Sequence, residues 1–210
     1  MDIVRPEIER YAEAHTTPPS ALLAALEAET RATMSSPEML TGTVEGRLLE
    51  LLVHASGARR VLEIGTYSGY SALSMAAGLP PDGRIETCEI DPSRAELARR
   101  YIAQSPYADR ITVHVGPALA SVAALEGAFD FAFVDADKPN YAHYIEAILP
   151  RLSERGLIAI DNTLWSGDVV DPHDDTARVI AELNDRLVAD SRLVVVQLTV
   201  RDGLTLIRRR

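Results

Sequence analysis

Lysine is almost absent from this chain, because Lys138 is the only lysine among 21 lysine and arginine residues. Arginine stays protonated at any working pH, so its side chain cannot take up a proton. A lysine amine can do so when burial or a neighbouring cation favours its neutral form. The segment that contains Lys138 reads FVDADK and is acidic. We therefore predict a general-base role for Lys138, the alternative being a solvated surface amine.

Cysteine, long apolar runs and an excess of positive charge are missing as well. Cys88 is the single cysteine, which excludes an internal disulfide and is typical of a reducing compartment. No apolar run reaches membrane-spanning length and segment 1–15 does not read as a signal peptide, so we expect a cytoplasmic protein with no membrane contact. The formal net charge of −10 argues against nucleic acid as a partner.

Apolar strands and helices alternate over most of the chain, and its 210 residues fit one domain. Helices are predicted first, at 20–34 and 44–56. Strands are predicted at 61–64, 84–90, 111–115, 129–135, 156–161, 192–200 and 203–210, with helices at 72–79, 91–105, 118–125, 139–152 and 176–190 between them and a polar loop at 162–175. This alternation is typical of an α/β fold with a doubly wound sheet, and Asp202-Gly203 predicts a closing hairpin.

Polar residues follow the ends of several predicted strands. Gly65 follows the first strand and Glu89 ends the second; Asp135 ends the fourth, and Asp161 with Asn162 ends the fifth. Sheets of this kind bind ligands at the carboxyl ends of their strands. We therefore expect these residues to surround one site.

The turn after the first strand reads EIGTYSGYS and indicates a nucleoside site. Gly65 and Gly69 permit a tight turn, but Tyr67 occupies the central glycine position of the dinucleotide fingerprint. Glu89 at the next strand end can accept both hydroxyls of a ribose, the alternative being a helix cap or a solvated carboxylate. A nucleoside without a diphosphate, such as S-adenosylmethionine, suits this pair of features.

Asp135, Asp161 and Asn162 supply three oxygen ligands from two strand ends. Hard oxygen ligands favour Mg²⁺, with Mn²⁺ or Ca²⁺ as alternatives. Two adjacent hydroxyls of a small aromatic diol can fill the open positions of such a site. Asp137 is either a fourth participant in this site or a residue that orients the cofactor or Lys138.

The chain resembles the S-adenosylmethionine-dependent O-methyltransferases of the catechol and caffeoyl-CoA type. The matching pieces are VLEIGTYSGYSAL, TCEIDP, GPAL, FDFAFVDADKPNY and IDNTLWSGDVVDP. The resemblance implies a class I Rossmann-like sheet of seven strands with an antiparallel last strand. It also implies one methyltransferase domain over 1–210, with an N-terminal helical region at 1–55 shaping the acceptor pocket and a cofactor-binding core at 56–210. Members of the caffeoyl-CoA type are commonly dimers, so we expect a homodimer.

The resemblance also assigns the site residues. Cofactor contacts are expected at Thr41, Glu63, Gly65, Tyr67, Ser71, Glu89, Ala118 and Asp135, and the metal at Asp135, Asp161 and Asn162. The cation would stabilise the phenolate while Lys138 accepts its proton. Lys138, Asn162 and Trp165 are the predicted acceptor contacts, with Trp165 either a wall against the aromatic ring or a loop anchor.

Other functions compete with this hypothesis. A haloacid-dehalogenase-like phosphatase would place its D-x-D after the first strand, and Pro139 stands where that class has Thr or Val. Against a NAD-dependent dehydrogenase, this sequence lacks the central glycine of the dinucleotide fingerprint. A non-catalytic nucleoside-binding protein would not need the metal and base residues. Among methyl acceptors, the alternatives are a catechol and a caffeoyl-CoA-type thioester. The arginine- and alanine-rich composition suggests a high-GC bacterium and favours a natural-product catechol.

Overall fold

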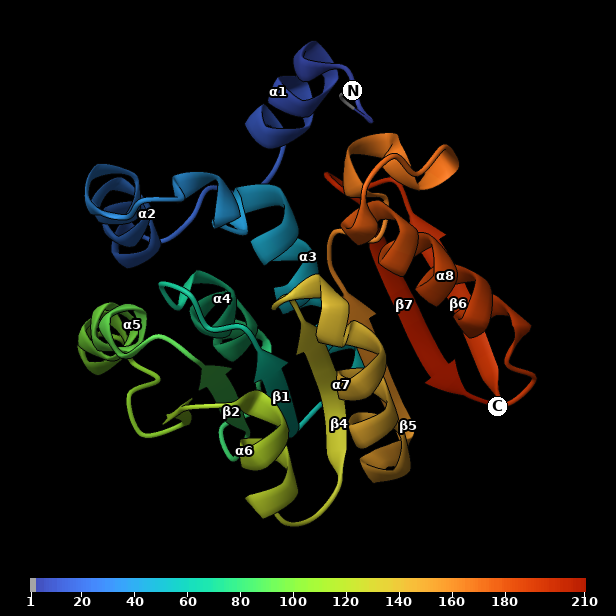
Figure 1. The fold of residues 1–210 in the computed structure, drawn as a ribbon. Coiled ribbons are helices and arrows are strands. Elements are labelled where there is room, and N and C mark those ends of the chain that lie inside the picture. Colours follow the sequence, from blue (N-terminus) through green and yellow to red (C-terminus); the bar gives the residue numbers. More distant parts are fainter. Residues whose placement is uncertain (1–2) are drawn as a thin grey trace.

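The computed structural model describes residues 3–210 and contains one mixed sheet (Figure 1). Its strands are β1 Arg60–Ile64, β2 Arg84–Glu89, β3 Ile111–Val115, β4 Phe129–Val134, β5 Leu152–Ile160, β6 Leu193–Leu198 and β7 Leu204–Arg209. They lie in the order β3-β2-β1-β4-β5-β7-β6. The first five strands are parallel, and β7 pairs antiparallel with β5 and β6. The predicted α/β doubly wound sheet of seven strands with an antiparallel last strand is confirmed.

Helices cover both faces of the sheet, because side chains alternate between the faces along each strand. The helices are α1 Pro6–Ala14, α2 Ala21–Thr33, α3 Gly42–Ser56, α4 Tyr70–Gly78, α5 Pro92–Gln104, α6 Ala118–Ala124, α7 Tyr141–Ile148 and α8 Asp175–Ala189, with 3₁₀ turns η1 Pro37–Met39, η2 Lys138–Asn140, η3 Leu149–Arg151 and η4 Trp165–Val170. Val61 of β1 packs in one core with α2–α5. Leu62 packs in the other with α6–α8, which lie in front of the sheet in Figure 1.

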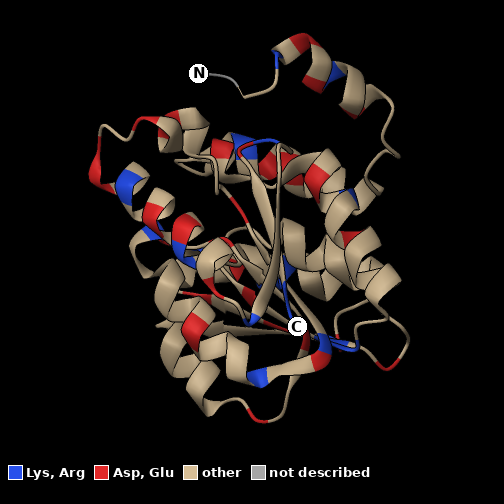
Figure 2. Ribbon diagram, turned by 90° about the vertical axis from the view of Figure 1, so that its right-hand side faces the viewer, with Lys and Arg blue, Asp and Glu red and all other residues tan. Residues whose placement is uncertain are grey.

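The N-terminal helices differ in how they attach to this core. Leu26 of α2 and Leu49 of α3 are fully buried and belong to the same core cluster as the sheet. Helix α1 buries no residue, carries charges of both signs and stands clear of the sheet (Figure 2). Among residues 3–210, no helix is long and apolar enough to cross a membrane.

The helix predicted at 139–152 and the strand predicted from 156 are wrong in extent. Helix α7 ends at Ile148, a 3₁₀ turn follows, and β5 already begins at Leu152. Pro150 explains the break, since proline lacks the N–H that an α-helix needs and clashes with the preceding turn. The loop predicted at 162–175 contains the short turn η4, in which Ser166 and Gly167 have left-handed backbone angles.

Gly65 brings the ends of β1 and β4 together. It has a φ of +105°, and a Cβ atom at this position would lie 2.0 Å from the carbonyl oxygen of Asp135. The order of the strands reverses between β1 and β4, which is where a doubly wound sheet opens a ligand crevice. The glycine therefore permits a close contact between the two strand ends that border this crevice.

We predict that Gly65→Ala destabilises the protein by about 3 kcal/mol or more, because the methyl group adds an overlap with backbone to an unfavourable φ. Gly57→Ala is the matched control: its φ is +66° and nothing lies within 4 Å of the added methyl group. The control should lose only about 1–2 kcal/mol, the cost of a left-handed backbone for a residue with Cβ. Urea unfolding measures both values, and equal losses would refute the role given to Gly65.

Candidate active site

Two connected cavities open at the carboxyl edge of the parallel strands. The larger has a volume of about 850 Å³ and the smaller about 470 Å³. Both are lined by Met39, Asp135, Ala136 and Asp137, so the end of β4 forms their common border. Two ligands bound in these cavities would meet at Asp135.

The smaller cavity contains most of the predicted cofactor residues. Five of the eight line it, namely Gly65, Tyr67, Glu89, Ala118 and Asp135. Glu89 is 4 % exposed, and its carboxylate accepts hydrogen bonds from the backbone N–H groups of Tyr67 (2.7 Å) and Asp91 (2.9 Å). These two donors fix the orientation of the carboxylate at the cavity wall. Cys88 also lines this cavity, and its thiol is buried, as expected, with a pKa raised to about 12 by that burial.

The other three predicted cofactor residues, Thr41, Glu63 and Ser71, are buried and do not line the cavity. Glu63 is fully buried two residues before Gly65. Its Oε2 accepts a hydrogen bond from the Thr87 hydroxyl, and its Oε1 has no partner. Burial raises the pKa of Glu63 to about 8. A buried carboxylate oxygen without a partner is costly, and a cationic group would satisfy it.

The larger cavity collects the predicted metal and acceptor residues, Asp135, Lys138, Asp161, Asn162 and Trp165. Asp161 is 5 % exposed and accepts the N–H of Asn162 at 2.7 Å. Burial, followed by the charge of Asp135, raises the pKa of Asp161 to about 7. Within residues 3–210 no group of three or more His, Cys, Asp and Glu side chains is arranged to hold a metal ion. A metal at Asp135 and Asp161 would therefore need the Asn162 amide as its third protein ligand.

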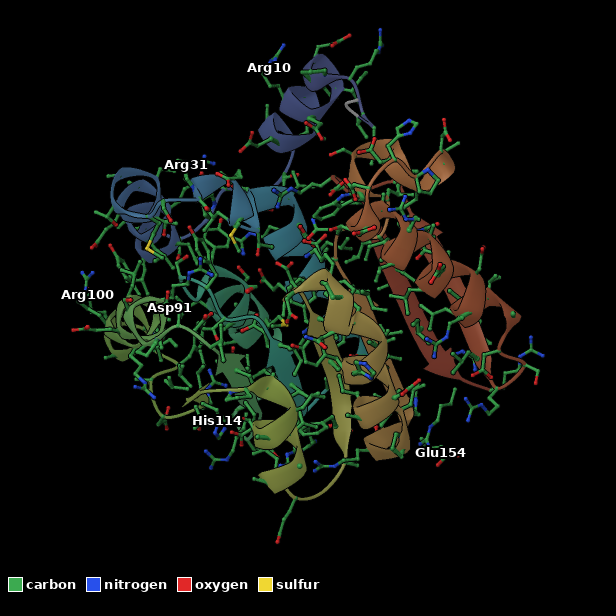
Figure 3. All side chains as sticks on the ribbon, viewed as in Figure 1. Arg10, Arg31, Asp91, Arg100, His114 and Glu154 are labelled. Carbon is green, nitrogen blue, oxygen red and sulfur yellow. The ribbon has the colours of Figure 1, made fainter. Side chains whose placement is uncertain are left out.

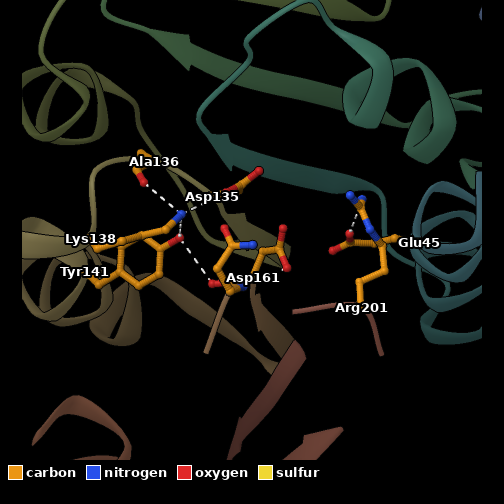
Figure 4. Close-up of polar contacts among 8 residues, drawn as sticks. Glu45, Asp135, Ala136, Lys138, Tyr141, Asp161 and Arg201 are labelled. Atoms are coloured by element: carbon orange, nitrogen blue, oxygen red, sulfur yellow. Dashed lines mark hydrogen bonds and ion pairs between the residues drawn. The ribbon is translucent and has the colours of Figure 1, made fainter. Parts of the chain in front are cut away.

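Lys138 lies between these carboxylates and the core (Figure 4). Its Nζ donates to the hydroxyl of Tyr141 at 2.7 Å, and to Asp135 Oδ1 and the Ala136 carbonyl at 3.1 Å each. Only 12 % of its side chain is exposed, so the interpretation as a solvated amine is wrong. Tyr141 is fully buried, and its hydroxyl also donates to the Asp161 carbonyl at 3.2 Å. The three-residue spacing between Lys138 and Tyr141 was the signal for this contact.

Glu45 and Arg201 extend the charged cluster and were not predicted from the sequence. The guanidinium of Arg201 donates to the Thr41 carbonyl and, at 3.1 Å, to Glu45 Oε2. Glu45 is 1 % exposed, and burial and the nearby Asp161 raise its pKa well above the usual range. One signal was available for Glu45, because it shares a helical face with the buried Leu49 and Val53.

Trp165 lies in a loop with several left-handed backbone angles. Asn162, Trp165 and Ser166 have φ values of 57°, 45° and 54°. Such conformations are unfavourable for residues with Cβ and cluster at functional sites. The loop places Trp165 on the wall of the larger cavity, with its ring centroid 6.0 Å from Lys138 Nζ.

Comparison with known proteins shows the family. The O-methyltransferase family matches residues 13–210. Caffeoyl-CoA O-methyltransferase 2 of Zea mays is 42% identical over 185 residues, covering 81% of this chain and 70% of the relative. Tricin synthase 1 of Oryza sativa subsp. japonica is 39% identical, covering 81% of this chain and 75% of that protein.

Solved structures agree with this result. The SAH-bound methyltransferase PaMTH1 of Podospora anserina has a TM-score of 0.91 at 29% identity, covering 97% of this chain and 94% of the other. The O-methyltransferase TomG of Streptomyces achromogenes, which is involved in tomaymycin synthesis and was crystallised with SAM, has a TM-score of 0.87 at 30% identity, covering 97% and 96%. These matches decide against the phosphatase and dehydrogenase hypotheses. The chain belongs to the O-methyltransferase family and is an enzyme of its S-adenosylmethionine-dependent, caffeoyl-CoA O-methyltransferase-like type.

Proposed function

We propose that this enzyme moves a methyl group from S-adenosylmethionine to one hydroxyl of a catechol-like molecule with the help of a divalent cation. The observation that carries this proposal is the junction at Asp135. There the cavity with the ribose-type acceptor Glu89 meets the cavity with the oxygen ligands Asp161 and Asn162. A methyl donor in one and an acceptor hydroxyl in the other would face each other.

The residues of the smaller cavity fit the proposed cofactor. Glu89 can accept both ribose hydroxyls while its other lone pairs remain bonded to backbone N–H groups. Glu63 does not line this cavity but is buried two residues before Gly65 of its wall, and its unpartnered oxygen suits a cationic amino group. The relatives crystallised with SAH or SAM have the same fold, which supports this assignment.

The residues of the larger cavity fit a hard divalent cation. Burial and, next to it, the like charge of Asp135 raise the pKa of Asp161, and a cation between the two carboxylates would relieve their repulsion. Carboxylate and amide oxygens favour Mg²⁺ over softer metals. When bound, the cation would lower the pKa of an acceptor hydroxyl and orient it.

Lys138 is the proposed proton acceptor. It lies on the same cavity wall as Asp135 and Asp161, and the Tyr141 hydroxyl and the Ala136 carbonyl hold its amine in place. The Trp165 ring, on the same wall, can pack against a flat aromatic acceptor. Water exclusion by these side chains favours a reaction in which the sulfonium charge disappears.

A caffeoyl-CoA-type acceptor is the second candidate, because the curated relatives include caffeoyl-CoA O-methyltransferases. The matches to methyltransferases decide against a non-catalytic nucleoside-binding role. The homodimer and the cytoplasmic location expected from the sequence stay predictions.

We predict that Lys138→Arg lowers kcat about 100-fold or more, since arginine keeps the charge beside Asp135 but cannot accept a proton. The affinity for adenosylhomocysteine should stay within about twofold, because Lys138 does not line the cofactor cavity. Steady-state kinetics and calorimetry test both statements. Normal turnover in the variant would mean that Lys138 contributes only its charge.

We predict that a chelator abolishes methyl transfer to catechols and that added Mg²⁺ restores it. Asn162→Ala should raise the Mg²⁺ concentration needed for half-maximal rate about tenfold or more, because one of three protein ligands is lost. Asp175→Asn, at an exposed residue of α8, is the control and should behave as wild type. Full activity in the presence of the chelator would remove the metal from the mechanism.

We predict that binding of adenosylhomocysteine at pH 7 releases close to one proton. Glu63, with a pKa of about 8, is mostly protonated before binding and must ionise to pair with the amino group of the ligand. Affinity should therefore rise with pH up to about 8 and then level off. Calorimetry in two buffers of different ionisation enthalpy measures the release, which Glu63→Gln should eliminate. A wild-type binding enthalpy that does not depend on the buffer would contradict the pairing.

A further inference from the structure

The acidic side chains of the larger cavity fall into an inner and an outer set. The inner set, Asp135 and Asp161, lies beside Lys138 and is where the cation is proposed. The outer set lies on the same cavity wall and consists of Glu9, Glu38, Asp137 and Asp202. These four residues come from α1, η1, the end of β4 and the β6–β7 turn, so separate parts of the chain bring them to one cavity.

The outer carboxylates have no positive partner in the part of the chain that the structure describes. Within residues 3–210 none of the four forms an ion pair. Asp137 accepts hydrogen bonds from the neutral Tyr144 hydroxyl and Asn140 amide, and Asp202 accepts the N–H of Ser166. Glu9 and Glu38 are exposed. Hydrogen bonds from neutral donors leave the negative charge uncompensated.

The positive side chains of the cavity are already engaged. Lys138 and Arg201 are the only cations among the described residues that line it. Lys138 pairs with Asp135, and Arg201 pairs with the buried Glu45 at 3.1 Å. Arg5, directly before α1, pairs with Glu7, and Arg94 lines the smaller cavity, where its guanidinium stacks on Tyr67 at 5.3 Å. Among residues 3–210, no free cation of this wall is left to meet an anionic acceptor.

From this charge pattern we propose that the outer half of the cavity selects acceptors by charge. It admits catechols whose side chain is neutral or positively charged and disfavours anionic ones, most of all coenzyme A thioesters. A thioester of that kind carries several phosphate charges, which normally require arginine or lysine partners. A binding site can reject a ligand through contacts between like charges as well as through the lack of favourable contacts. This inference rests on the proposed catechol methylation and separates it from the caffeoyl-CoA activity of the Zea mays relative.

Four acceptors that share the diol and differ in charge test the inference: dopamine, ethylcatechol, dihydroxyphenylpropanoate and caffeoyl-CoA. With Mg²⁺ and S-adenosylmethionine at low salt, kcat/KM should be highest for the cation, about tenfold lower for the monoanion and lowest for the thioester. Raising the salt concentration should lower the value for dopamine, raise it for the monoanion and leave ethylcatechol unchanged.

The double variant Glu9→Gln/Glu38→Gln should lower the dopamine-to-propanoate ratio of kcat/KM about threefold or more. The kcat/KM for ethylcatechol should stay the same. Glu154→Gln is the matched control, because Glu154 is exposed near the start of β5, at the opposite end of the sheet (Figure 3). It removes the same charge and should keep the wild-type ratio. All four side chains of the outer set are exposed or half-exposed, so the variants should fold and unfold at about the wild-type temperature.

Two outcomes overturn the inference, and they differ. In the first, the enzyme methylates the diols but prefers caffeoyl-CoA, or the double variant leaves the dopamine-to-propanoate ratio of kcat/KM unchanged. This outcome refutes charge selection alone and leaves catechol methylation in place. Absence of methylation for all four acceptors refutes the proposed function and the inference together.

Discussion

The site depends on the balance of charge among carboxylates that the fold buries at the carboxyl edge of its sheet. Asp161 and Glu45 are 5 % and 1 % exposed, and Asp135 lies beside them. Such a group of like charges is unstable without positive partners. Lys138 contacts Asp135 and Arg201 contacts Glu45, whereas Asp161 forms no ion pair within residues 3–210 and would gain from a cation. The chemistry proposed for the enzyme uses this cation.

The topology of the sheet explains why cofactor and acceptor cavities meet where they do. The order of strands reverses between β1 and β4, so the connections after these strands leave toward opposite faces and open a crevice. Gly65 allows the β1 end to approach the Asp135 carbonyl, and the end of β4 then borders both cavities. The same short segment thus supplies the proposed metal ligand Asp135 to one cavity and part of the wall of the other.

Much of this arrangement could be predicted from the sequence, because the signals are local. The alternation of apolar strands and helices predicted the sheet, and polar residues at strand ends predicted which side chains converge. The contacts of Arg201 could not be predicted, since Arg201 lies in the β6–β7 turn and its partners Thr41 and Glu45 are about 160 positions away at the start of α3. The premature end of α7 could have been read from Pro150, whereas the early start of β5 depends on its pairing with β4.

Acceptor choice can diverge in this fold while the chemistry stays fixed, because the two depend on different parts of the chain. Lys138 on η2 and Tyr141 on α7 contact Asp135 and Asp161, which follow β4 and β5, and substitutions there leave unpaired buried charges that cost several kcal/mol. Glu9 and Glu38 are exposed on α1 and η1, where an exchange of charge costs about 0.5 kcal/mol or less. Helix α1 buries no residue, and the family match begins only at residue 13. An identity of 42% to the Zea mays relative is therefore better evidence for a shared methyl-transfer reaction than for an acceptor of the same charge.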